Sequence, residues 1–257
     1  MLPSKDNLPI EIKTSADIEK MRRAGTITAK VLLKLEGSIC PGISTQYLDD
    51  LAFKEISSLG VKPAFLGYRG YPASICVSIN NELVHGIPRS SRILKEGDIA
   101  SIDLGVICDG FYGDMAATYA VGKIAPAAKR LIEVTKASLN KAIAQVKPGR
   151  RLGDVSSAVQ KYAEGEGFSV VRDYVGHGIG RKMHEEPSIP NFGEPDTGPR
   201  LLPGMALAIE PMLNEGTWEV KTLPDNWTVV TSDGKLCAHF EHTVLVTEKG
   251  HEILTTL

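Results

Sequence analysis

Apolar residues near the start of the chain recur with the spacing of one helix face: Ile18, Met21, Val31, Leu32 and Leu35. Thr14 or Ser15 can cap the start of this helix, and Gly37 marks its end. A second helix is predicted over residues 45–59, and two more over 127–146 and 152–166. The pattern therefore predicts two helices early in the chain and two later, separated by strand-like sequence.

Runs of β-branched and apolar residues predict strands over residues 74–79, 99–107 and 111–121. Asp109-Gly110 joins the last two runs, and this pair favours a tight hairpin because both positions tolerate positive φ. The turn sets a register in which Cys108 faces Phe111. Asp109 needs no further explanation, since it serves the turn.

The same register brings two aspartates together. Gly105 would face Asp114 and Asp103 would face Ala116, so Asp103 and Asp114 become diagonal neighbours on one face, about 7–8 Å apart. Two carboxylates on an apolar face repel each other and lose hydration unless cations lie between them. The gap suits a pair of cations roughly 3.5–4 Å apart. The alternative, in which one aspartate only caps or solvates the hairpin, explains this pair poorly.

The second half of the chain repeats features of the first. Residues 94–103 (LKEGDIASID) resemble residues 201–210 (LLPGMALAIE), an offset of 107 from Asp103 to Glu210, and Pro41-Gly42 and Pro148-Gly149 share this offset. We therefore expect two related halves that bring Asp103 and Asp114 from one, and Glu210 and Glu241 from the other, to a shared axis. Residues 218–234 lengthen the second interval and are expected to loop out.

Helices and antiparallel strands in two similar halves predict an α+β fold, with helices covering one face of a curved sheet. We expect an N-terminal extension over residues 1–12 and a single domain over 13–257, with pseudo-repeats at about 13–121 and 122–257. The stretch 192–203, rich in proline and glycine, is predicted to be a surface loop.

Composition narrows the possible classes of function. The chain has 257 residues, 42% hydrophobic and 23% charged, which is typical of a globular protein. A net charge of −2 implies no general attraction to nucleic acid or acidic membranes. The chain lacks a CxxC pair, an apolar run of about 18 residues and a signal-peptide core. We therefore expect a soluble cytoplasmic protein with four reduced thiols, Cys40, Cys76, Cys108 and Cys237.

His177 lies in the sequence GHGIG, residues 176–180, where the glycines leave its imidazole as the only side chain able to reach a cation. A lone histidine is more often structural, but this setting favours a ligand. One nitrogen with four carboxylates suits Mn²⁺, Fe²⁺, Co²⁺ or Zn²⁺, and the sequence leaves the choice among them open. The candidate ligands are Asp103, Asp114, His177, Glu210 and Glu241.

Longer motifs accompany these residues: LGY at 66–68, YP at 71–72, SICVSIN at 74–80, VHGIP at 84–88, HEEP at 184–187, IEP at 209–211 and EHT at 241–243. With the candidate ligands they span the chain from about residue 12 to its end and resemble the type I methionine aminopeptidases, metallopeptidases of family M24. The resemblance implies the pita-bread fold, in which two pseudo-symmetric halves form a curved antiparallel sheet with helices on its outer face.

The resemblance also implies roles. The five candidate ligands match those of the family's two divalent metal ions (Co, Mn, Fe or Zn), between which a hydroxide would attack the first peptide bond. Glu210 would accept the proton of the attacking water, His184 would polarise the scissile carbonyl, and His85 would contact the amide beyond the cleaved bond. Alternatively, His85 and His184 could take no part in the reaction and could only support neighbouring ligands or lie at the surface. His239 and His251 have no such context, and His242 is expected to support a neighbouring ligand.

An apolar pocket for a methionine side chain is implied at six positions: Phe65, Tyr68, Tyr71, Cys76, Met183 and Trp227. The family's motif often has phenylalanine in place of Met183 and a smaller residue in place of Phe65, which leaves the shape of the pocket open. Tyr71 could instead belong to the core.

The implied activity is removal of the N-terminal methionine from nascent proteins and peptides with a small second residue. Its partners would be polypeptides that begin with Met, with the ribosome exit region as a candidate, and we expect a monomer that binds neither membranes nor specific nucleic acid. A proline-specific aminopeptidase of the same fold is one alternative, although such enzymes usually carry a large N-terminal domain. A non-catalytic pita-bread binding module is another, although it would be expected to have lost ligands.

Overall fold

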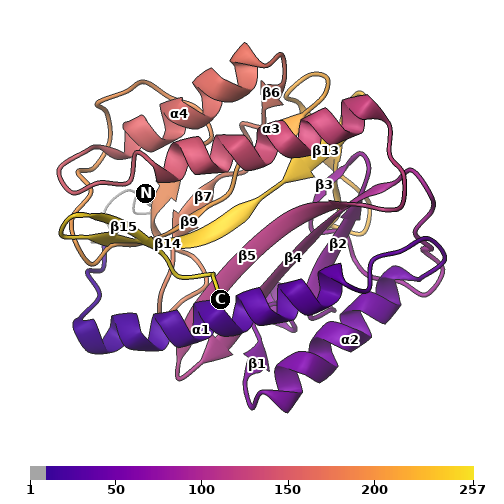
Figure 1. Ribbon diagram of the computed structural model, residues 1–257, viewed down its shortest axis with the longest axis horizontal. Coiled ribbons are helices and arrows are strands. Elements are labelled where there is room, and N and C mark those ends of the chain that lie inside the picture. Colours follow the sequence, from indigo (N-terminus) through magenta and orange to yellow (C-terminus); the bar gives the residue numbers. More distant parts are fainter. Residues whose placement is uncertain (1–9) are drawn as a thin grey trace, which may run out of the picture.

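Two pairs of helices cover one antiparallel sheet in the computed structural model, which describes residues 10–257 (Figure 1). The described residues contain four α-helices: α1 (Ser15–Glu36), α2 (Thr45–Ser58), α3 (Pro126–Ile143) and α4 (Leu152–Gly165). In Figure 1, α1 and α2 lie beside β4 and β5, and α3 and α4 lie on the other side of β14. This arrangement confirms the α+β class and the four predicted helices.

The long strands form a sheet that has nine strands in the part of the chain that the structure describes. Its order is β1-β4-β5-β14-β9-β7-β8, with β2 beside β4 and β15 beside β14. The strands are β1 (Lys62–Pro63), β2 (Ile75–Ile79), β4 (Ile99–Cys108), β5 (Phe111–Ala120), β7 (Gly176–Gly178), β8 (Glu185–Ile189), β9 (Ala206–Ile209), β14 (Glu241–Thr247) and β15 (Gly250–Ile253).

Local sequence signals explain the helix ends and the central hairpin. Thr14 caps α1 through a reciprocal pair of hydrogen bonds with Asp17, since its hydroxyl accepts from the Asp17 amide while the Asp17 carboxylate accepts from the Thr14 amide. Asp109 and Gly110 both have positive φ, 51° and 80°, and close the turn between β4 and β5. The predicted register of this hairpin is confirmed, with Gly105 opposite Asp114 and Asp103 opposite Ala116.

Residues 218–234, the segment expected to loop out, lie outside the main sheet but have strand structure of their own. They contain a hairpin of β11 (Val220–Thr222) and β12 (Val229–Thr231), and β12 also pairs with β3 (Glu82–Val84). Burial of all three residues of β12 stabilises this small sheet, although each strand is too short to show an alternating pattern in the sequence. A second small sheet consists of β6 (Ser169–Val170), β10 (Met212–Asn214) and β13 (Cys237–His239).

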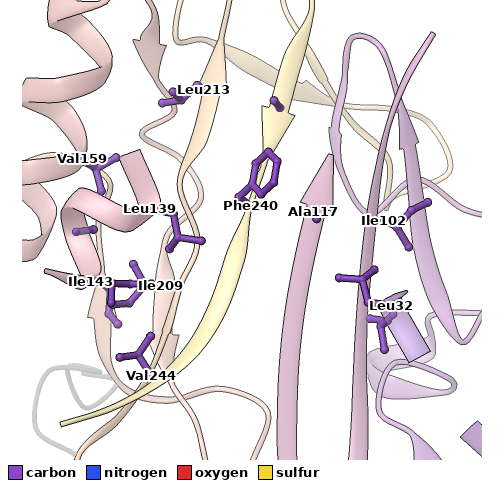
Figure 2. Packing of buried hydrophobic residues seen from close by; sticks show 14 of the residues in the cluster. Leu32, Ile102, Ala117, Leu139, Ile143, Val159, Ile209, Leu213, Phe240 and Val244 are labelled. Carbon is purple, nitrogen blue, oxygen red and sulfur yellow. The ribbon is translucent and has the colours of Figure 1, made fainter. Parts of the chain in front are cut away.

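One hydrophobic core continues under both pairs of helices. Figure 2 shows Leu32 of α1 near Ile102 of β4, and Ile143 of α3 near Ile209 and Val244 of the second half. The predicted loop over residues 192–203 is confirmed, although Leu201 at its end is buried in this core. Residues 1–9 of the expected N-terminal extension lie outside the described residues, so the division into an extension and one domain stays a prediction. Among residues 10–257, no helix is both long and apolar enough to cross a bilayer.

Close contact between α1 and β5 generates the first testable prediction. A Cβ added to Gly113 would lie 2.8 Å from the backbone carbon of Ala24 in α1, so Gly113→Ala must push helix and strand apart. Because overpacking of a filled core is destabilising, we expect the free energy of unfolding to fall by about 1–3 kcal/mol in urea denaturation. Gly37→Ala is the matched control, since its Cβ would meet nothing closer than 3.7 Å. Equal stabilities of the two variants would contradict this account of the packing.

Candidate active site

Five neighbouring strands of the sheet each bring one candidate ligand to the same cavity. Asp103 lies on β4, Asp114 on β5, Glu241 at the start of β14, Glu210 directly after β9 and His177 on β7. The sheet is antiparallel at each of these steps, and Ala208 pairs with both His177 and Thr243. All five side chains line a cavity of about 150 Å³, so the structure brings together the whole predicted ligand set.

The protein leaves several oxygens of these carboxylates without partners. Among the described residues, no hydrogen bond reaches Asp103 Oδ1, Asp114 Oδ1 or Glu241 Oε1, although all three atoms are buried. Buried carboxylate oxygens are expensive to leave unpaired. The site therefore presents carboxylate oxygens without hydrogen-bond donors, and a bound cation would provide the positive charge that they lack.

The tautomer of His177 points to the same conclusion. Its Nδ1 lies 2.9 Å from the carbonyl oxygen of Gly178, and because a carbonyl only accepts, Nδ1 carries the proton. The Nε2 lone pair then faces Asp114 Oδ2 at 3.8 Å and Glu210 Oε1 at 3.6 Å. A lone pair among carboxylates is repulsive unless a cation lies between them. The donor set, oxygen-rich with one imidazole nitrogen, fits a divalent transition metal.

Burial controls the protonation of the ligands. It lowers the pKa of His177 to about 3, so the imidazole is neutral, as a metal ligand must be. Burial also raises the pKa of Asp114 to about 7. For Asp103, Glu210 and Glu241, burial and the nearby carboxylates raise the pKa well above its usual range. Without cations these groups would hold protons near neutral pH.

The two predicted catalytic histidines lie at different places in the same cavity. His184 stands at the exposed mouth, where its ring centroid is 4.3 Å from that of His177 and its Nδ1 is 2.8 Å from the hydroxyl of Tyr68. His85 is half-buried, with the strained φ of 61°, and its ring meets Trp227 edge-on at 6.0 Å. Loss of hydration, the largest cause for both, lowers the pKa of each to about 4, and for His184 this loss is partial because the residue stays exposed at the mouth. Both are therefore neutral imidazoles at neutral pH.

All six residues of the predicted substrate pocket line this cavity: Phe65, Tyr68, Tyr71, Cys76, Met183 and Trp227. Tyr71 also has a structural part, because its buried hydroxyl donates toward the carbonyls of Ile75 and Gly86, each at 3.1 Å. Burial raises the pKa of the Cys76 thiol well above its usual range, so this thiol stays protonated and behaves as a small apolar surface.

Three residues at the site were missed by the sequence analysis. Arg69 lines the cavity with a φ of 49°, its guanidinium 5.3 Å from the centre of the Tyr68 ring, and Tyr174 packs edge-on against His85. His239 is buried beside Glu210 and Glu241. Of the three residues, only His239 could have been placed at the site from the sequence. Side chains two positions apart on a strand share a face, so Glu241 already implied the place of His239. His242, expected to support a ligand, instead contacts Thr255 at 2.8 Å.

Comparison with known proteins defines the class. The model of metallopeptidase family M24 matches residues 19–248, and the chain belongs to this family. Within the family it is similar to methionine aminopeptidase 1 of Bacillus subtilis, 56% identical over 95% of this chain and 98% of the relative. The solved structure of methionine aminopeptidase from Thermotoga maritima superposes with a TM-score of 0.96 at 51% identity, covering 97% of this chain and 100% of the other.

A more distant match shares the fold alone. Prolidase from Pyrococcus furiosus superposes with a TM-score of 0.77 at 24% identity, covering 96% of this chain but 65% of the prolidase. The pita-bread fold inferred from the motifs is therefore confirmed, and the similarity is far stronger to the methionine aminopeptidases.

The protonation of the ligands predicts how stability depends on pH. Burial raises the pKa of Asp114 from 3.8 to about 7, so between these values the folded chain binds more protons than the unfolded chain. This group's contribution to the free energy of unfolding is therefore present at low pH and is lost as pH rises through about 7. Because cations replace these protons, we expect Mn²⁺ to stabilise the protein more near pH 7.5 than near pH 5.

Urea unfolding with EDTA or with Mn²⁺ at the two pH values measures this difference. Asp114→Asn is the matched variant, because it removes the titrating group with little change in shape and should reduce both the pH dependence and the Mn²⁺ effect. Equal stabilisation by Mn²⁺ at both pH values would contradict the account.

Proposed function

We propose that this chain is a metal-dependent methionine aminopeptidase that removes the N-terminal methionine from nascent proteins and peptides with a small second residue. One observation carries the proposal. The five candidate metal ligands and an apolar pocket lined by aromatic rings and sulfur atoms share one cavity. The names of the similar proteins support the same activity.

The proposed metal site consists of Asp103, Asp114, His177, Glu210 and Glu241, which we expect to hold two divalent ions. Such ions, when bound, lower the pKa of water and polarise carbonyl oxygens. Which metal occupies the site (Co, Mn, Fe or Zn) depends both on the affinity of the site for each ion and on the availability of each ion in the cell. Glu210 is the proposed proton acceptor for the attacking water, because its carboxylate borders both the ligand cluster and the open cavity.

His184 is the proposed donor to the scissile carbonyl. If the hydroxyl of Tyr68 donates to Nδ1 of His184 across their 2.8 Å contact, the remaining proton lies on Nε2. A neutral imidazole can then donate this N–H to the oxyanion that forms during attack. The ring of Tyr68 stacks on His184 at 5.5 Å between centroids and fixes its orientation.

The pocket explains the proposed preference for methionine. Cys76 and Met183 contribute polarisable sulfur, and Tyr71 and Trp227 meet edge-on at 5.0 Å between centroids to form a rigid aromatic wall. Such a surface favours a flexible thioether. His85, held between Trp227 and Tyr174, is the proposed contact for the amide beyond the cleaved bond, and it narrows the passage for the second residue.

The proposed setting is the cytoplasm, with nascent chains that begin with Met as substrates and the ribosome exit region as a candidate contact. Support for a reducing compartment comes from the four cysteines, all of which are free thiols. We also propose a monomer. The complete ligand set argues against a binding module that has lost metal.

Release of free methionine from Met-Ala-Ser is the direct test. Chelator-stripped protein should be inactive, and added Mn²⁺ or Co²⁺ should restore cleavage. Met-Lys-Ser should be cleaved far more slowly, because the larger second residue meets His85, and Ala-Pro-Ala should not be cleaved. Cleavage of Ala-Pro-Ala would favour a proline-specific enzyme instead, and no cleavage by metal-loaded protein would favour a binding module.

Two variants separate metal binding from catalysis. Glu210→Ala should abolish turnover, because it removes a ligand and the proton acceptor together. His85→Ala should bind metal normally and lose rate, by about 10²-fold or more if this histidine takes part in the chemistry. Metal content measured by atomic absorption, beside kcat and KM, distinguishes the two effects. Full activity of Glu210→Ala with metal bound would mean that the site is wrongly assigned.

A further inference from the structure

His239 is a buried polar residue to which the proposed mechanism gives no role. The residue is 1% exposed, and neither ring nitrogen has a hydrogen-bond partner among the described residues. Its Nε2 lies 3.6 Å from Glu210 Oε2 and 4.0 Å from Glu241 Oε2. These are its nearest charged groups, and Glu210 is only slightly beyond hydrogen-bond distance.

The backbone of His239 is held firmly in this position. It pairs with Met212 across β10 and β13. The Thr118 hydroxyl on β5 accepts from the His239 amide and donates to its carbonyl, both at 2.9 Å. Phe240, the next residue, points into the core in Figure 2, and the alternation directs His239 and Glu241 toward the ligands instead. The sheet therefore aims this imidazole at the metal cluster.

Glu210 lies between two imidazoles that differ in their hydrogen-bonding capacity. Its Oε1 faces Nε2 of His177, which presents a lone pair because Nδ1 donates to the Gly178 carbonyl. Its Oε2 faces Nε2 of His239, where no carbonyl fixes the proton on Nδ1. A neutral imidazole carries one N–H, and placing it on Nε2 gives the carboxylate a donor where a lone pair would repel it. The two oxygens of Glu210 thus have different tasks.

We propose that His239 is a positioning residue that donates its Nε2 proton to Glu210 Oε2, and so holds the carboxylate with Oε1 directed at the ligand cluster. This inference rests on the proposed function, because it concerns the orientation of the group that accepts the proton. His239 acts through Glu210 and contacts neither the substrate pocket nor the exposed mouth of the cavity.

The rival role is that of a sixth metal ligand, since Glu210, His239 and Glu241 offer ligand atoms within 4.8 Å of one another. The two roles require different chemistry at Nε2. A ligand presents a lone pair, whereas a positioning residue presents an N–H. Glutamine can supply an N–H from a side chain of similar length but is a weak ligand for transition metals, and leucine fills the space with neither group.

His239→Leu and His239→Gln therefore separate the alternatives, with His251→Gln as a control on β15. His251 contacts the Val146 carbonyl at 3.2 Å and does not line the cavity, so its variant should behave as the wild type. Each protein is titrated with Co²⁺ by calorimetry and visible absorption, and kcat and KM are measured with Met-Ala-Ser. Urea unfolding of each variant checks that it folds.

We expect His239→Leu to bind as much Co²⁺ as the wild type and to lose about 10–100-fold in kcat with little change in KM. His239→Gln should recover most of this loss, because it restores the donor. Equal kcat for His239→Leu and the wild type would overturn the inference, as would a lower Co²⁺ stoichiometry with an altered spectrum in His239→Gln. Wild-type cleavage, measured in parallel, tests the proposed function separately, and the Co²⁺ data do not depend on it.

Discussion

Four carboxylates and one imidazole line a single buried cavity, and the rest of the structure serves to hold them there. Burial and mutual repulsion raise the pKa of Asp103, Glu210 and Glu241 well above the usual range. A loose chain would relieve this strain by moving the groups apart. Here, they are attached to five adjacent strands whose backbone hydrogen bonds fix the spacing between side chains. Divalent cations are the simplest charges that satisfy this arrangement.

The same rigid sheet links fold to chemistry outside the metal cluster. The close approach of α1 to Gly113 fixes the position of β5 and therefore of Asp114. Thr118, on the same strand, holds the backbone of His239 through a hydrogen bond. The histidines around the cavity are neutral because burial disfavours the imidazolium. They can therefore act as ligands and hydrogen-bond donors without adding charge. The walls of the adjoining apolar pocket come from loop residues, from Cys76 on β2 and from Trp227 in the turn between β11 and β12.

The sequence predicted features that local signals or a repeat encode. Asp109-Gly110 was enough to derive the β4–β5 register and the shared face of Asp103 and Asp114, and apolar spacing with a capping residue located α1. The contacts of Arg69 and Tyr174 could not be predicted, because they depend on long-range packing of irregular segments. The β11–β12 hairpin escaped notice because three-residue strands carry almost no periodicity. His239 was overlooked although strand alternation with Glu241 indicated its direction.

Anomalous diffraction from crystals grown with Mn²⁺ would test the central claim most directly. If the buried carboxylates exist to hold cations, strong peaks at the manganese edge should lie among Asp103, Asp114, His177, Glu210 and Glu241. The electron density should show the oxygens that lack protein partners directed at those peaks. The absence of any peak in this cavity at saturating Mn²⁺, with the carboxylates paired to one another through shared protons, would contradict the account.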